Sequence, residues 1–76
     1  MKNLLNVKEH TRVKIKAIVG GMEVQQKLMQ LGIGVDSVVI VQRSAAFAGP
    51  LMLECNGRSV VIGRGIAFKI MVEEII

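Results

Sequence analysis

The sequence predicts a mainly β fold: a small closed or nearly closed barrel of about five short strands, with one short α-helix after the first strand. Three patterns favour this fold: a stretch that alternates charged and apolar residues, a single segment with helical spacing, and an Asn-Gly pair between two apolar runs. The chain has 76 residues, of which 51% are hydrophobic. We expect this length to form one domain, residues 1–76.

The first predicted strand is Thr11 to Val19, TRVKIKAIV, in which charged and apolar residues alternate. Because successive side chains of a strand point to opposite faces, one set should face the core and the other set should face water. The set expected in the core is Val13, Ile15 and Ala17. The set expected in water is Arg12, Lys14 and Lys16.

Helical spacing is found from Met22 to Leu31, after a Gly-Gly break. Its apolar stripe is Val24, Leu28 and Leu31, and a helix this short needs the stripe packed on the sheet. Gly32 fits the left-handed position just past a helix end, and Ile33 can then fold back onto the last turn. A phosphate-binding loop is not expected, because in such loops the glycines precede the helix, whereas here they follow it.

The other strands are expected at Ser37–Arg43, Leu51–Cys55, Arg58–Ile62 and Lys69–Glu74, with a short turn or single helical turn at 66–68. Asn56-Gly57 is typical of a hairpin with a type I′ turn, whose two central residues need positive φ. Counting outward from the turn pairs Cys55 with Arg58 and Leu51 with Ile62. The core face should then carry Leu51, Leu53, Val60 and Ile62. The outer face should carry Met52, Glu54, Ser59 and Val61. The last strand should turn Ile70 and Val72 inward.

Residues that perform catalysis or bind metals are scarce. His10 and Cys55 are the only residues of their types, and no spacing such as CxxC or HExxH organises a site around them. Nucleophilic catalysis needs a nucleophile beside a base, so we do not expect an enzyme, a cofactor or a metal site. Cys55 is predicted to be an exposed or half-buried structural thiol. Metal sensing through His10 or Cys55 stays open as a minor hypothesis.

The net charge of +4 is concentrated before residue 20 and supports an alternative function. In this alternative, a regulatory module binds nucleic acid or anionic surfaces through Arg12, Lys14 and Lys16. The chain has two Phe and no Tyr or Trp, which leaves little aromatic surface for stacking bases or for binding proline-rich peptides. Nucleic acid is therefore not the favoured partner.

The longest candidate for a membrane span, the apolar stretch SAAFAGPLML, is interrupted by Gly49 and Pro50. A membrane span needs about 18 or more consecutive apolar residues. The N-terminal stretch before Lys8 is also too short for the apolar region of a signal peptide. We therefore expect a cytoplasmic protein without membrane insertion.

Apolar residues left outside the predicted core favour a protein interaction. They are Phe47, Pro50, Met52 and Val61, with Met29 off the helix stripe. For Phe47 there is an alternative, in which the ring folds back and plugs the end of the barrel.

Several of these features, taken in order, resemble the FeoA family, the small SH3-like proteins of bacterial ferrous iron transport. The matching pieces are Leu28, Leu31-Gly32-Ile33, Gly49-Pro50 and the closing Arg64, Ala67, Ile70 and Val72. The resemblance covers nearly the whole chain, from about Val7 to the end. It departs from the family where members often have a Pro-Gly turn, here Val35-Asp36, and where the loop usually has its first proline, here Ala46.

The resemblance implies an SH3-like barrel and a cytosolic accessory protein of ferrous iron uptake, peripheral to the inner membrane only through its partner. It also implies contact with FeoB, the membrane transporter that carries a GTPase domain. We expect that contact through Phe47, Pro50 and Met52, with Arg64 as a polar or charged contact. Because the same domain occurs at the end of iron-dependent repressors, a regulatory interaction module is the related expectation. The oligomeric state stays open, and spare apolar surface is compatible with a homo-oligomer.

Overall fold

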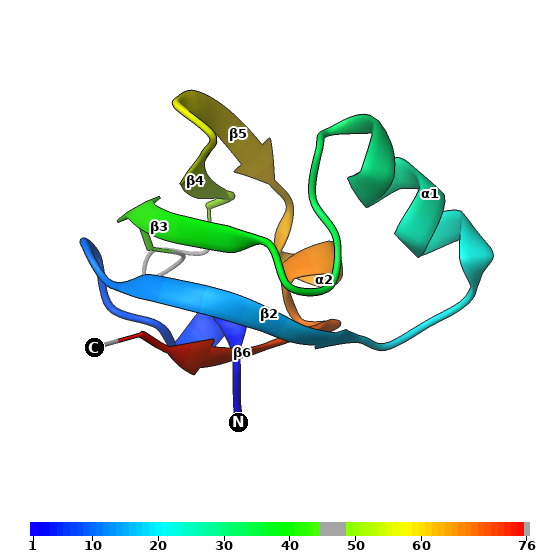
Figure 1. Ribbon diagram of the computed structural model, residues 1–76, viewed down its shortest axis with the longest axis horizontal. Coiled ribbons are helices and arrows are strands. Elements are labelled where there is room, and N and C mark those ends of the chain that lie inside the picture. Colours follow the sequence, from blue (N-terminus) through cyan, green and yellow to red (C-terminus); the bar gives the residue numbers. More distant parts are fainter. Residues whose placement is uncertain (45–48, 76) are drawn as a thin grey trace.

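The computed structural model describes residues 1–44 and 49–75 and confirms the mainly β fold (Figure 1). Its sheet has six strands, where about five were expected. The strands are β1 (Lys2–Asn3), β2 (Arg12–Ile18), β3 (Val38–Arg43), β4 (Leu51–Cys55), β5 (Arg58–Ile62) and β6 (Ile70–Glu74). The helices are the 3₁₀ turn η1 (Leu4–Asn6), α1 (Met22–Gln30) and the single turn α2 (Arg64–Ala67). No helix in the described residues is long and apolar enough to cross a membrane.

The sheet is antiparallel throughout, in the order β1-β6-β2-β3-β4-β5, so β1 and β5 are its two edges. α2 follows β5 and η1 follows β1, and these two short helices contact each other. Their contact links the segments that follow the two edge strands. Figure 1 shows α1 to one side of the strands, where it joins β2 to β3.

The alternation along the strands builds the core as predicted. Val13 and Ile15 on β2, and Ile70 and Val72 on β6, are completely buried. Leu28 is the fully buried residue of α1, while the other members of the stripe pack partly against the core. These inward side chains hold the sheet and α1 together because each removes apolar surface from water.

The β4–β5 hairpin has the predicted register, with Cys55 paired to Arg58 and Leu51 to Ile62. Asn56 and Gly57 have φ values of 54° and 79°, as a type I′ turn requires. The inward residues are buried as expected: Leu51, Leu53, Val60 and Ile62. The outward residues are half-buried or exposed: Met52, Glu54, Ser59 and Val61.

The prediction for Ala17 is wrong. The pairing of β2 with β6 shifts between Ile15 and Ala17, which leaves Lys16 as an extra residue on β2. A bulge of this kind reverses the alternation beyond it. Ile18 therefore packs against the core, and Ala17 is only half-buried.

Residues 2–6 form structure that the sequence pattern did not predict. β1 adds to the edge of β6, and η1 buries Leu4 completely. Asn3 holds this segment from both sides: its side-chain oxygen accepts the Leu5 N–H at 2.9 Å, and its amide donates to the carbonyl of Phe68. The N-terminal segment thus adds Leu4 to the core.

Candidate functional site

The outer face of β3, β4 and β5 carries a hollow of about 430 Å³, called here the sheet groove. It is lined by Glu9, Arg43, Ser44, Gly49, Pro50, Leu51, Met52 and Val61. Met52 stands at its centre because it pairs with Val61 on one side and Arg43 on the other. Val61 is 57% exposed and Met52 is half-buried. The groove therefore offers a fixed apolar surface on the rigid ladder of the sheet.

The structure brings together two of the four predicted partner-binding residues. Pro50 and Met52 both line the sheet groove, and Val61 joins them from β5. Arg64 is exposed at the start of α2 and is not among the lining residues. Phe47 lies outside the described residues, so its predicted position, in the patch or as a plug, stays a prediction.

Glu9 and Arg43 are the charged residues of this groove that sequence reasoning missed. The Glu9 carboxylate accepts the Ser44 N–H at 3.3 Å, and the N–H of His10 donates to the Val41 carbonyl at 2.6 Å. These bonds hold the segment before β2 beside the end of β3. No local sequence pattern predicts this contact, because it joins residues more than thirty positions apart.

A polar network borders the groove on the same face of the sheet. The Ser59 hydroxyl donates to the Gln42 side-chain oxygen at 3.0 Å, and the Gln42 amide donates to the Glu54 carboxylate at 3.4 Å. The network thus links β3, β4 and β5 through their outer side chains. It marks where the apolar surface around Met52 ends.

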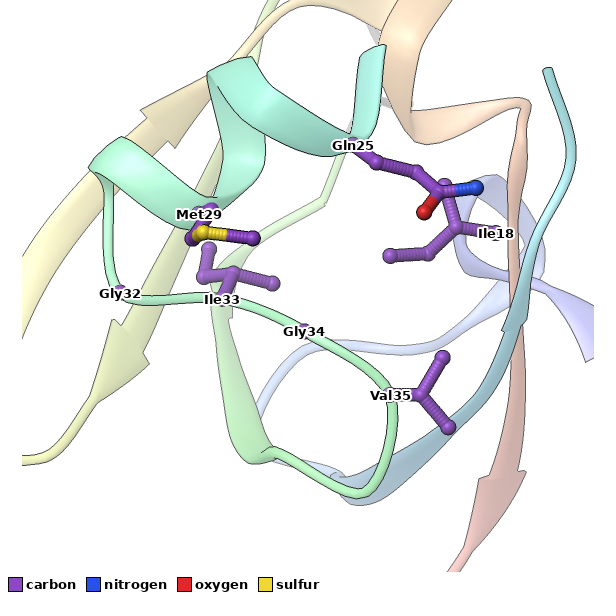
Figure 2. Close-up of a pocket in the computed structure, with 7 residues that line it drawn as sticks. All are labelled: Ile18, Gln25, Met29, Gly32, Ile33, Gly34 and Val35. Carbon is purple, nitrogen blue, oxygen red and sulfur yellow. The ribbon is translucent and has the colours of Figure 1, made fainter. Parts of the chain in front are cut away.

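A second hollow, called here the helix groove, lies beside α1 and has a volume of about 340 Å³. It is lined by Ile18, Gln25, Met29, Gly32, Ile33, Gly34 and Val35 (Figure 2). Figure 2 shows Met29 above Ile33 at one end, and Gln25 beside Ile18 at the other. Met29 and Val35 are 72% and 55% exposed, whereas Ile33 is 2% exposed. None of the described residues that line this groove is charged.

The helix groove is shaped by the stop of α1, which confirms the predicted cap. The Ile33 N–H donates to the Leu28 carbonyl and the Gly32 N–H to the Met29 carbonyl, both at 2.9 Å. Gly32 has φ = 80°. This is the Schellman arrangement, in which the residue after the glycine folds back onto the helix. The chain then turns through Asp36, also at positive φ, whose N–H donates to the carbonyl of Ile15.

Two residues from the hairpin brace this junction. The Arg58 guanidinium donates to the Leu31 carbonyl at 3.3 Å, and the Cys55 thiol donates to the Gly32 carbonyl at 3.8 Å. Cys55 is buried, so the expectation of an exposed or half-buried thiol is wrong. Its position follows from the strand alternation, which places Cys55 on the same inward face as Leu51 and Leu53.

Comparison with known proteins decides the family. A model of the FeoA domain matches residues 2–74. The chain belongs to the FeoA family. It is 38% identical over 74 residues to a protein of Methanocaldococcus jannaschii named "Putative Fe(2+) transport protein A", covering 97% of this chain and 88% of the relative.

Solved structures agree with the FeoA fold. A crystal structure of an iron uptake regulatory protein (FeoA) superposes with a TM-score of 0.85 at 25% identity, covering 96% of this chain and 95% of the other. The solution structure of the FeoA protein from Chlorobium tepidum gives 0.87 at 25% identity, over 99% of this chain and 71% of the other. ScaR with bound Zn²⁺ gives 0.88 at 21% identity and is matched over 37% of its length, which shows a shared fold alone. The SH3-like architecture is thus confirmed.

The basic strand of this FeoA-family chain is partly neutralised by neighbouring acids. Lys14 Nζ lies 3.9 Å from a carboxylate oxygen of Asp36, and Lys14 is the cross-strand partner of Glu73. Arg12 and Lys16 remain exposed on either side of it. Anionic ligands bind best to uninterrupted positive charge, so the structure adds no support for the alternative function.

Metal ligands do not gather in the described part of this FeoA-family chain. Residues 1–44 and 49–75 contain no group of three or more His, Cys, Asp or Glu side chains that could hold an ion. Cys55 is in the core, and His10 is exposed on the turn before β2. Metal sensing through either residue stays an untested hypothesis.

Proposed function

We propose that this protein is a cytosolic accessory protein of ferrous iron uptake that acts by contact with a FeoB-type membrane transporter. Membership of the FeoA family over residues 2–74 is the observation that carries the proposal. The name of the Methanocaldococcus jannaschii relative supports it, because that name refers to Fe(2+) transport. In this role the protein reaches the membrane through its partner.

The sheet groove is the surface that we assign to the contact. Protein interfaces combine a desolvated apolar centre with a polar rim. Met52, Val61 and Pro50 supply such a centre, while Glu9 and Arg43 supply charges beside it. Phe47, an apolar residue left outside the predicted core, and Arg64, as a polar or charged contact, complete the proposed contact.

A substitution inside the groove tests this assignment. Met52→Glu places a charge at the apolar centre, and we expect it to weaken binding to the purified cytosolic domain of the FeoB-type transporter at least tenfold, or about 1.4 kcal/mol. Phe47→Ala is expected to weaken the same binding. Binding is measured by isothermal titration calorimetry, and circular dichroism verifies that each variant is folded.

Met29→Glu is the matched control, because it places the same charge on another exposed methionine, in the helix groove. We expect its affinity to stay within twofold of the wild type. If Met52→Glu and Phe47→Ala bind as well as the wild type, the contact lies elsewhere. If the wild-type protein does not bind the domain, the transporter contact itself is wrong.

A further inference from the structure

The edge strand β5 presents unused backbone hydrogen-bonding groups. In the type I′ hairpin, Cys55 and Arg58 flank the turn and form a hydrogen-bonded pair. Hydrogen-bonded and non-hydrogen-bonded pairs alternate along an antiparallel ladder. Ser59 and Val61 therefore belong to the non-bonded pairs, with Glu54 and Met52 respectively. Their N–H and C=O groups point away from β4, toward the free side of the edge.

Nothing in the described residues satisfies these groups. β5 has no neighbour on its outer side. Outside the regular ladder, the backbone hydrogen bonds of residues 1–44 and 49–75 do not involve Ser59 or Val61. Both residues are exposed. An exposed row of unpaired donors and acceptors is a template for another strand.

The two edges of the sheet differ in length and in what covers them. β1 is two residues long, and its side chains are tied back by the Lys2–Glu74 ion pair and the Asn3 bonds. β5 is five residues long. Short strands protect an edge from pairing, whereas a longer uncovered strand does not. β5 is therefore the edge at which a further strand fits.

The free edge of β5 runs directly beside the sheet groove. Val61 belongs to both, because its backbone groups face the edge and its side chain lines the groove with Met52. In a strand added next to β5, every second side chain would lie on the outer face, next to Val61. Such a strand would bind through its backbone at the edge and through an apolar side chain at the groove, which is the usual division in strand addition.

The charges around this edge favour an acidic occupant. β5 contains no acidic residue and begins with Arg58, and Arg43 lines the groove nearby. Neither arginine makes an ion pair with a described residue. Glu9 also lines the groove and offsets the charge of Arg43 there. The charge that distinguishes the edge itself is therefore that of Arg58, which donates to the Leu31 carbonyl but has no acidic partner among the described residues. A second copy that paired through its own β5 would bring no acidic residue to this edge.

We infer that the β5 edge receives an extended segment of the transporter, which adds as a seventh strand and carries acidic residues beside an apolar one. This inference rests on the proposed function, since it specifies how the same partner is held. The apolar side chain enters the sheet groove beside Met52 and Val61. The acidic side chains lie at the Arg58 end of the edge.

Proline substitutions at the edge separate backbone pairing from side-chain contact. Ser59→Pro removes an outward N–H, and proline is tolerated at an edge position whose N–H faces solvent. We expect Ser59→Pro to weaken binding to the purified cytosolic domain of the FeoB-type transporter tenfold or more. Ser59→Ala is the matched control, because it removes the hydroxyl and keeps the N–H; its affinity should stay within twofold of the wild type.

A second pair and a direct measurement protect this test against misfolding of one variant. Val61→Pro should weaken binding more than Val61→Ala, since both lose the valine side chain and only the first loses the N–H. In the wild-type complex, amide hydrogen exchange of Ser59 and Val61 should slow at least tenfold, as new strand pairing requires.

The outcomes distinguish the mode of binding from the partnership itself. If the domain binds the wild type but the proline variants bind like their alanine controls, and the two amides exchange as in the free protein, strand addition is wrong and the groove contact stands. If the wild type does not bind, the proposed function fails as well. If sedimentation shows a wild-type dimer that Ser59→Pro dissociates, the edge receives a second copy and the acidic occupant is wrong.

Discussion

The sheet groove and the helix groove are similar in size but are built by different means. The sheet groove lies on strands paired with each other, and residues as distant as Glu9 and Ser44 close one end of it. The helix groove lies between α1 and a loop shaped by the local stop at Gly32. One surface therefore depends on the long-range ladder, and the other on how a single nine-residue helix is attached. They should respond differently to the same kind of damage.

Weakening the attachment of α1 should give the largest difference in stability between the two grooves. Leu28 is the fully buried residue of α1. Leu28→Ala should reduce the free energy of unfolding by about 3 kcal/mol, because it removes apolar contacts and leaves a cavity. The loss should fall first on α1, since a helix this short is not stable without its docked stripe.

Urea unfolding measures the total loss for Leu28→Ala, and residue-resolved hydrogen exchange measures where it falls. We expect faster exchange along α1 and unchanged exchange in the β4–β5 ladder under native conditions. Binding to the transporter domain gives a second comparison. Leu28→Ala should not show the loss of affinity that is expected for Met52→Glu in the sheet groove. Equal acceleration in α1 and in the ladder would show that the two grooves form one cooperative unit.

The C-terminal cap of α1 can be tested with a smaller perturbation, by comparing substitutions at two glycines with positive φ. A Cβ at Gly32 would lie 2.7 Å from the Arg58 guanidinium, whereas a Cβ at Gly57 would meet nothing within 4 Å. Gly57→Ala should cost about 1 kcal/mol from backbone strain alone. Gly32→Ala should cost about 1–2 kcal/mol, because it also displaces Arg58 from the Leu31 carbonyl.

The double variant Gly32→Ala with Arg58→Ala identifies the cause of the difference. Without the guanidinium, the alanine at position 32 meets no obstacle, so its cost should fall to that of Gly57→Ala. Free energies of unfolding, measured in urea for the single and double variants, complete a double-mutant cycle. An undiminished cost in the Arg58→Ala background would place the extra strain in the backbone of the helix stop.

The parts of the fold that depend on local chemistry were predictable from the sequence. The cap at Gly32 and the hairpin register at Asn56-Gly57 were both confirmed, since each rests on a few neighbouring residues. The register in turn placed Met52 and Val61 on one outer face, which is why part of the sheet groove was predicted. Long-range pairing was not predictable in the same way.

Apart from the burial of Cys55, which the strand alternation itself implies, the errors lie where distant segments meet. β1 forms only because β6 offers it an edge, and two residues carry no pattern of their own. The bulge at Lys16 arises in the pairing of β2 with β6, so the regular alternation of the sequence wrongly assigned Ala17 to the core. Glu9 and Arg43 enter the groove through contacts between the segment before β2 and the end of β3.

The smallest predicted effect is at β1, the edge strand opposite β5. A variant there serves as a control for both grooves. Lys2 donates to the Glu74 carboxylate at 2.8 Å. This hydrogen bond, and then the charge of Lys2, lowers the pKa of Glu74 below its ordinary value of 4.5. Because the folded state has the lower pKa, the pair stabilises the protein above about pH 4.5, and the contribution is lost as the pH falls through the folded-state value.

Glu74→Gln removes this dependence without altering either groove. Both side chains of the pair are about half exposed, at 44% and 51%, so solvent screens the interaction and the loss should be small. We expect the wild type to be slightly more stable than Glu74→Gln in urea at pH 6, and the difference to disappear near pH 3. Hydrogen exchange of α1 and of β5 should be the same in both proteins, because β1 and β5 are opposite edges of the sheet. Faster exchange in either groove would mean that the N-terminal strand supports a surface with which it makes no pairing.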